Sequence, residues 1–410
     1  MGASNRLWNK DFTIMTVGSV ISMLGNSVAG FAIGLLMLDY TDSIFLYALT
    51  MVLYNMPKIF MPSLSGPFLD KFSRRKTMYV LDFISAALFG VIAIMSFTGS
   101  FSYAVILTMC IIIGTIDSIY MIAYESLFPL LISKENYTKA YSISAVIGNI
   151  SQIALFVAPI VYYSYGTAPL FAFNAVTFLV AAIFETMIRA NESQVQHLSE
   201  KYNIKSYAND FKIGLRYLLK NKGLLYIVLF YVVLMSAGGM SSTLVLPFFK
   251  NTEGLGVTKF VYIIAGMVAG RLLGSGFHYT KKVKDSKKYL IAIIAFFSMT
   301  IVDGTYMFTN LPIMIVCMFI SGLMTVTTYN LRMSSTQSYV PNEMRARFNG
   351  TFQTLTMAGG SIFGLVGGAL ADLVPIPYVV LGGNAIVFIA IFVILIRNKK
   401  EVKRVYNHEF

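Results

Sequence analysis

A few ionisable residues fall inside or at the ends of long apolar stretches of this sequence, where a charge is costly unless it has a function. Asp117 could take up a proton, pair with a cation, or be solvated in a wide water-filled mouth. Lys58 could pair with Asp82 or Asp117, or extend its amine to water. Glu125 ends its stretch and is the residue of this group most open to solvent. Proton transfer and charge pairing are the chemistry that these types suggest.

The remaining reactive residues do not assemble into a recognisable catalytic or metal-binding pattern. Arg271 lies in an apolar stretch without an obvious acid, and we expect Asp303, near the end of another, to be solvated. Cys110, Cys317 and three histidines are too scattered for a disulfide framework or a metal site. The sequence contains no G-x-x-x-x-G-K-[ST] phosphate loop and no cluster of acids and histidines at catalytic spacing. We therefore predict no enzyme, metal or cofactor.

The apolar stretches themselves predict an integral membrane protein. Of the 410 residues, 56% are hydrophobic and 12% are charged, and the mean hydropathy is +0.69. A spanning helix needs roughly 20 mostly apolar residues, and the first stretch is too long for a cleavable signal peptide. Twelve segments qualify as spans: 12–38, 43–66, 77–98, 101–124, 138–163, 168–188, 223–248, 256–278, 288–309, 311–331, 348–371 and 376–396.

The basic residues are distributed asymmetrically, and this distribution predicts topology. The formal net charge is +13. Apart from Lys58, Lys250, Lys259 and Arg271, every Lys and Arg falls in the N-terminal tail, in every second loop or in the C-terminal tail. This bias places both termini in the cytoplasm. We expect a multi-pass protein of the cell membrane, such as a bacterial inner membrane, with attraction to anionic lipid and no role in nucleic-acid binding.

The sequence matches itself at an offset of 208 residues. Gly66 meets Gly274, and the predicted span boundaries of the two halves coincide. Six spans followed by six in the same orientation predict an all-α fold of two six-helix bundles, the parallel-repeat plan of secondary transporters. The bundles are 1–190 and 223–410, the second with a basic tail, and the linker 191–222 is cytoplasmic. Its residues 207–221 alternate apolar and basic positions as an amphipathic interfacial helix does.

One charged loop resembles a known signature. GPFLDKFSRRK, residues 66–76, is similar to the loop between helices 2 and 3 of the major facilitator superfamily, with Gly66, Asp70, Arg74 and Arg75 on its positions. Ser73 replaces the usual second glycine. YVPNEMRARFNG, residues 339–350, and the glycine-rich stretch 359–372 resemble the drug-exporter branch that includes macrolide and siderophore exporters. The resemblance covers essentially the whole chain.

The charged loop has two interpretations. Its cations could serve only to hold the loop in the cytoplasm. Alternatively the loop is a latch, as the resemblance also implies: Gly66 permits close helix approach, and Asp70 caps a helix that begins near residues 347–350. Arg74 or Arg75 would then reach an acid on helix 4. We expect the latch to close the cytoplasmic side in the outward-facing state.

The resemblance also implies a central cavity lined by helices 1, 4, 7 and 10, with contributions from helices 5 and 11. We expect an alternating-access exporter of a hydrophobic or amphipathic drug-like molecule, working as a monomer by proton antiport with Asp117 as first proton carrier. A lysolipid or lipid flippase and an uptake carrier remain alternatives, ahead of a membrane sensor or enzyme. The candidate cavity residues are Asn26, Ser22, Tyr54, Gly114, Asn149, Gln152, Met235, Met240, Ser321, Thr325, Gln353, Met357 and Arg271.

Overall fold

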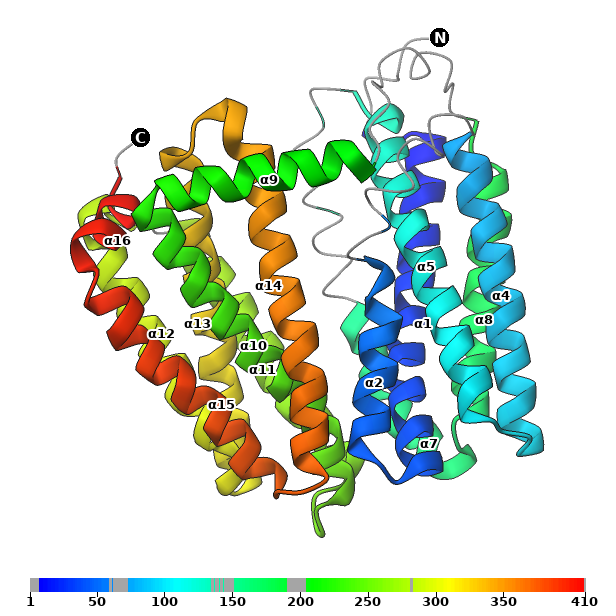
Figure 1. The fold of residues 1–410 in the computed structure, drawn as a ribbon. Coiled ribbons are helices and arrows are strands. Elements are labelled where there is room, and N and C mark those ends of the chain that lie inside the picture. The colour runs from blue at the N-terminus through cyan, green and yellow to red at the C-terminus, as the bar shows by residue number, and fades with distance from the viewer. Residues whose placement is uncertain are drawn as a thin grey trace. The chain divides into compact units, whose positions relative to one another are not determined.

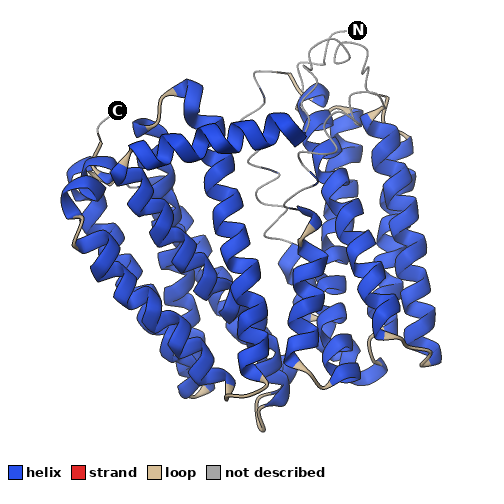
Figure 2. Cartoon of the chain, in the orientation of Figure 1, coloured by secondary structure: helices blue, strands red, loops and turns tan. Residues whose placement is uncertain are grey.

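The computed structural model describes residues 7–58, 61, 73–133, 136, 140, 143, 151–189, 204–280 and 283–408. Within these ranges the regular structure is helical, and no strand is present (Figure 2). The chain divides into two compact units. Unit 1 contains residues 1–42 and 53–207, and unit 2 contains residues 43–52 and 208–410. Helix α2, Ile44–Asn55, therefore begins in unit 2 and ends in unit 1.

In unit 1, α8 packs along both α1 and α4, and α5 packs on α4 (Figure 1). The α1 N-terminus is capped by Asn9, whose side chain accepts a hydrogen bond from the Phe12 amide. Ser73 caps α4 in the same way, and Gly99 ends that helix in the left-handed conformation that glycine adopts most easily. The helices of unit 1 after α2 are α4 Arg74–Thr98, α5 Tyr103–Leu127, η1 Phe128–Leu131, η3 Ser151–Phe156, α7 Ala158–Tyr165 and α8 Ala168–Thr186, and α1 Lys10–Thr41 precedes them.

In unit 2, α11 packs along α13 and α10 packs along α14 (Figure 1). Glycines permit these contacts. A Cβ on Gly270 of α11 would lie 2.0 Å from the carbonyl oxygen of Phe319, so the two backbones touch. The elements are α9 Ile204–Lys220, α10 Lys222–Asn251, α11 Gly256–Thr280, η4 Asp285–Lys287, α12 Lys288–Thr305, η5 Tyr306–Phe308, α13 Leu311–Tyr339, α14 Asn342–Ala371, α15 Ile376–Ala390, a π-helical turn Ile391–Ile396 and α16 Lys399–Tyr406.

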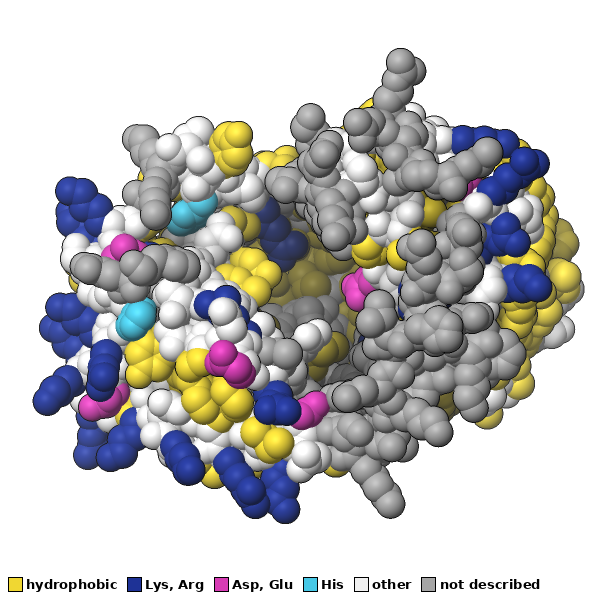
Figure 3. All heavy atoms as spheres, turned by 90° about the horizontal axis from the view of Figure 1, so that it is seen from above, with side chains coloured by type: hydrophobic (Ala, Val, Ile, Leu, Met, Phe, Trp, Pro, Cys, Tyr) yellow, Lys and Arg dark blue, Asp and Glu magenta, His cyan; other side chains and the backbone are white. Residues whose placement is uncertain are grey.

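Two amphipathic helices cover one end of unit 2. Gly214 of α9 packs against the backbone of Arg347 in α14, and Gly223 of α10 packs against α16. The apolar face of α16 buries Val402 and Val405. Basic side chains gather on this end of unit 2 (Figure 3), and the cytoplasmic location of this end stays a prediction. An interfacial role for α9 stays a prediction.

A carboxylate of unit 2 caps the start of α2. The Asp372 side chain at the end of α14 accepts hydrogen bonds from the Ile44 amide at 3.0 Å and from the Ser43 hydroxyl at 3.1 Å. The Phe45 amide adds a third at 3.4 Å. The first amides of a helix have no partner within the helix and carry partial positive charge, so an anion at this position is stabilising.

Ten helices of the described ranges are long and apolar enough to cross a membrane. Of two shorter apolar helices, Ile44–Asn55 falls within the predicted span 43–66, and Ala154–Tyr165 overlaps the predicted span 138–163 and ends two residues beyond it. A count of twelve spans therefore stays a prediction. Two boundaries differ from the predicted ones. The helix predicted to end at residue 331 continues to Tyr339, and the helix expected to begin near residues 347–350 begins at Asn342. The extension of α13 is a polar segment with Arg332, Ser335 and Thr336 buried, whereas α14 begins with the exposed residues Asn342 and Glu343.

Candidate functional site

Unit 1 brings Asp117 together with a tyrosine and a lysine. The Tyr54 hydroxyl, at the end of α2, donates to Asp117 Oδ2 of α5 at 2.8 Å. Lys58 Nζ lies 3.6 Å from the same oxygen and 4.6 Å from the centroid of the Tyr54 ring. Gly114 makes the approach possible, because a Cβ there would lie 2.0 Å from the Tyr54 carbonyl oxygen. The chain ends α2 just before Pro57, which directs Lys58 toward α5.

A second acidic pair lies deeper in unit 1. Asp82 of α4 and Glu185 of α8 are each 1% exposed, on two helices that pack along each other, and their charges interact. The Tyr120 hydroxyl donates to Glu185 Oε1 at 2.6 Å. Asp82 Oδ2 and Glu185 Oε2 have no hydrogen-bond partner in the described part of the chain. Two buried carboxylates at close range repel strongly when both are ionised, so this pair is suited to holding a proton.

Sequence reasoning included Asp82 but missed Glu185. Glu185 precedes the basic loop by only a few residues, so a hydropathy window treats it as the polar end of a span. Its spacing from Asn174 and Thr177 along α8 puts these polar groups on one buried stripe. That stripe is a signal that could have identified it.

The signature loop is only partly described. Gly66 and Asp70 lie outside the described residues. Arg74 donates a hydrogen bond to the Ser126 carbonyl at 3.2 Å, and Arg75 donates one to the Ile188 carbonyl. Both arginines thus tie the start of α4 to neighbouring chain ends within unit 1, and the latch stays a prediction. Glu125 is exposed.

Arg347, expected near the partner site of that latch, pairs with another acid in the structure. Its Nε donates to Asp210 Oδ1 of α9 at 2.8 Å. The contact joins α14 to the amphipathic helix, and both side chains are partly exposed, at 40% and 27%.

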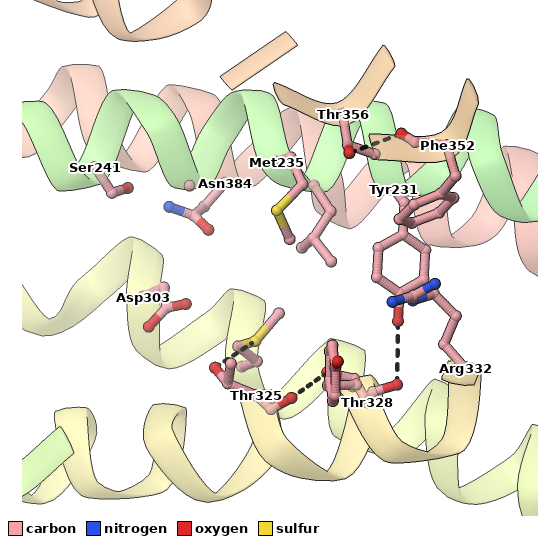
Figure 4. A pocket seen from close by; sticks show the side chains of 14 residues that line it. Tyr231, Met235, Ser241, Asp303, Thr325, Thr328, Arg332, Phe352, Thr356 and Asn384 are labelled. Atoms are coloured by element: carbon pink, nitrogen blue, oxygen red, sulfur yellow. Dashed lines mark hydrogen bonds between the residues drawn. The ribbon is translucent and has the colours of Figure 1, made fainter. Parts of the chain in front are cut away.

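Unit 2 contains a pocket of about 330 Å³, large enough for a small molecule (Figure 4). Met235 and Thr325, two of the predicted cavity residues, belong to its wall. Aromatic, thioether and hydroxyl groups predominate, together with one acid and one base. The lining residues are Tyr231, Leu234, Met235, Gly238, Ser241, Met299, Asp303, Thr325, Thr328, Tyr329, Arg332, Phe352, Thr356 and Asn384.

The acid and the base occupy different ends of this pocket. Arg332 lies beside Tyr231 and Phe352, while Asp303 lies near Ser241 and Asn384 (Figure 4). Tyr231 and Ser241 are ten residues apart on α10, which corresponds to about 15 Å along a helix axis. Asp303, expected to be solvated at a helix end, instead forms part of the pocket wall.

Arg332 was missed by the sequence analysis. The span was predicted to end at residue 331, so the arginine was counted with the cations of the next loop. It is only 7% exposed within α13. Its guanidinium carbon lies 4.2 Å from the centroid of the Phe352 ring, 5.3 Å from that of Tyr231 and 5.5 Å from that of Tyr329. Burial raises the pKa of nearby Tyr406, in α16, so that side chain supplies no counter-charge.

The other predicted cavity residues are dispersed. Met240 and Ser321 are buried, and Ser22 and Asn26 of α1 each have a buried oxygen without a partner among the described residues. Gln353 is exposed beside Met357, and Arg271 is exposed on α11. Asn149 and the side chain of Gln152 lie outside the described part. Within the described residues, no group of three or more His, Cys, Asp or Glu is placed to hold a metal ion.

Solved transporter structures share this fold. A nucleoside transporter, NupG, superimposes with a TM-score of 0.72 at 13% identity, covering 95% of this chain and 99% of that one. The fucose:proton symporter FucP of E. coli gives 0.59 at 14% identity over 99% and 100%. A bacterial homologue of the iron transporter ferroportin gives 0.70 at 15% identity over 97% and 98%.

Sequence relatives are similar to the chain at low identity. Macrolide efflux protein A of Streptococcus pyogenes is 23% identical over 400 residues, covering 94% of this chain and 95% of that protein. The MFS-type transporter YkuC of Bacillus subtilis is 27% identical over 293 residues, 67% of this chain and 66% of that protein. The transmembrane secretion effector family model matches residues 2–407. The chain is thus a multi-pass cell-membrane protein of this family within the major facilitator superfamily, whose members are transporters and not enzymes.

Proposed function

We propose that the chain exports an amphipathic small molecule in exchange for protons, by alternating access. The observation that carries the proposal is the pocket of unit 2, whose aromatic and methionine walls adapt to bulky apolar bodies while its polar ends orient a ligand. The macrolide efflux relatives support export of a large amphipathic compound. A carrier of this plan uses no phosphate-bond energy directly, so the driving force is an ion gradient.

The buried acids of unit 1 are the proposed proton carriers. Asp117 is held by Lys58 and Tyr54, and removal of its charge by protonation frees the lysine to move. Asp82 and Glu185 would share a further proton, which the Tyr120 hydroxyl orients. A proton that neutralises these acids on one side of the membrane and leaves from the other would bias the conformational equilibrium.

The test is proton movement in proteoliposomes. A pH-sensitive dye is trapped inside, a pH gradient is imposed, and macrolides, lipophilic cations, aromatic acids and lysolipids are added singly. We expect proton flux that depends on one class of compound and that is lost in Asp117→Asn. Asp42→Asn is the matched control, because Asp42 is exposed and has a positive φ of 50°, which asparagine tolerates.

The outcomes separate the alternatives. Compound-dependent proton flux that survives Asp117→Asn would overturn the role of Asp117 and leave Asp82 and Glu185 to be tested in the same assay. Compound movement without proton flux would overturn antiport. Lysolipid movement between leaflets, with no flux of the other compounds, would replace export by flippase activity.

A further inference from the structure

The pocket of unit 2 holds a permanent cation, Arg332, for which the described residues supply no counter-ion. Arg332 is 7% exposed, and its Nε has no hydrogen-bond acceptor in the described part of the chain. No carboxylate of the described residues lies within salt-bridge distance of it, and the ion pairs of unit 2 involve other residues. A buried charge inside a membrane span is costly and is retained for function. The missing partner is therefore expected from a ligand.

The surrounding aromatic rings compensate only part of this cost. Phe352 and Tyr231 present their faces to the guanidinium at 4.2 and 5.3 Å, which attracts the positive charge. A ring face offers no lone pair to an N–H group, and guanidinium carries five such donors. The Tyr231 hydroxyl can satisfy one of them, since it uses its own proton to donate to the Thr328 carbonyl at 3.1 Å. At least the Nε–H has no acceptor among the described residues.

The two charged ends of the pocket are not equivalent. A carboxyl group such as Asp303 becomes neutral by binding a proton, and Ser321 is within hydrogen-bonding reach of it. Arginine cannot be neutralised in this way in a protein. The charge that any ligand meets under all conditions is therefore that of Arg332. The wall also offers the apolar side chains of Leu234, Met235 and Met299.

We propose that this pocket binds amphipathic anions, with a carboxylate, sulfonate or phosphate group on Arg332 and an aromatic or branched apolar body against the methionines. A planar guanidinium accommodates such groups through two parallel hydrogen bonds. The inference rests on the proposed function and makes its substrate an acid. It distinguishes this chain from a transporter whose pocket selects lipophilic cations through an acid.

Headgroup preference tests the proposal directly, without transport. Three probes share one naphthalene body: 2-naphthoate is an anion, 2-naphthylmethylammonium a cation and 2-naphthylmethanol is neutral. Their dissociation constants are measured by calorimetry on the full chain in nanodiscs, with empty nanodiscs subtracted. We expect 2-naphthoate to bind roughly tenfold or more tightly than the other two, the ratio that a charge-assisted hydrogen bond provides.

Three variants test which residue causes the preference for the anionic probe. Arg332→Gln should abolish it, weakening 2-naphthoate to the level of 2-naphthylmethanol. Arg332→Lys keeps the positive charge but lacks the planar guanidinium group, so the dissociation constant of 2-naphthoate should lie between those of the wild type and of Arg332→Gln. Asp303→Asn should keep or strengthen the preference for the anion, because it removes a negative charge from the pocket. This third variant keeps the proposal testable if the substitutions at Arg332 prevent folding.

Several results would overturn the proposal. Equal binding of the three probes, or tighter binding of the cation, would do so. An anion preference that survives in a folded Arg332→Gln protein would also do so, since it would reduce Arg332 to a packing residue. If binding shows no anion preference while proton-coupled flux of other compounds is observed in proteoliposomes, the proposed function stands and only the substrate class is wrong.

Discussion

Lys58 Nζ lies 3.6 Å from Asp117 Oδ2, so that a base and an acid from different segments pair within unit 1. The Lys58 side chain is 34% exposed and that of Asp117 is 17% exposed. Solvent reaches one partner more than the other. The pair can therefore open toward water without unfolding the helices that carry it, which is what a residue that exchanges protons requires.

This geometry predicts the outcome of a double-mutant cycle. Lys58→Met leaves the acid without its cation and should lower the free energy of unfolding by about 1 kcal/mol, a value limited by solvent exposure. Lys58→Met combined with Asp117→Asn should recover most of that loss, because no unpaired charge remains. Thermal melting of the purified protein measures all four states. Strictly additive changes would show that the two side chains do not interact.

The acid pair of α4 and α8 predicts a pH-dependent difference in stability. Asp82 and Glu185 are both buried, so ionising both places two negative charges close together. If the folded pair holds a proton that the unfolded chain releases, stability falls as pH rises through the value at which the folded pair loses that proton. Glu185→Gln should make the stability less dependent on pH. The variant should therefore be more stable than the wild type at alkaline pH but not at acidic pH. Melting temperatures at several pH values test this, with Asp42→Asn expected to follow the wild type.

The close contact at Gly114 predicts a steric effect. Gly114→Ala would place a Cβ 2.0 Å from a backbone oxygen, an atom that cannot rotate away. The backbone must shift to accommodate this Cβ, and we expect the free energy of unfolding to fall by about 1–3 kcal/mol. We also expect reduced transport, because Tyr54 moves away from Asp117. Gly90→Ala in α4 is the control, since nothing lies within 4 Å of its added Cβ. That change should be neutral or raise helix stability by about 0.5–1 kcal/mol. Equal effects at the two positions would contradict the packing described here.

The ion pair between α9 and α14 should contribute little to the stability of the folded protein. Arg347 and Asp210 are 2.8 Å apart but 40% and 27% exposed, so water and salt screen their attraction. A double-mutant cycle with Arg347→Gln and Asp210→Asn should give a coupling of about 0.5 kcal/mol in dilute buffer and less at high salt. A coupling free energy several times larger and unaffected by salt would mean that this ion pair is a main contribution to the stability of α9 packing on α14.

Much of the fold could be predicted because lipid imposes a length and a polarity on each helix. Apart from α13 and α14, the amphipathic α9 and the long apolar helices lie within a few residues of their predicted positions. Prediction failed where polar residues are covered by protein instead of water. The last turns of α13 contain several Ser and Thr and look like a loop to a hydropathy window. There α16 packs on α13 and accepts the Ser335 hydrogen bond at the Tyr406 carbonyl, while the Phe352 ring of α14 lies against Arg332.

The candidate sites show the same limit. Asp117 and Asp82 could be selected from sequence because they interrupt apolar runs, yet nothing in the sequence pairs Asp82 with Glu185, more than a hundred residues away. Asp303 was assigned to solvent by its place near a helix end. Whether such a residue meets water depends on the rotation of the helix about its axis, which neighbouring helices determine and a single-sequence pattern does not.

The cap of Asp372 on α2 has a consequence for how the gene can be divided. Unit 2 is not one continuous piece of chain, since residues 43–52 belong to it together with residues 208–410. A fragment starting at residue 223 would leave the Asp372 carboxylate without the Ile44 amide that it now binds. The two sequence repeats therefore do not coincide with the two compact units, and expression of the chain in two pieces would require both pieces to be made together.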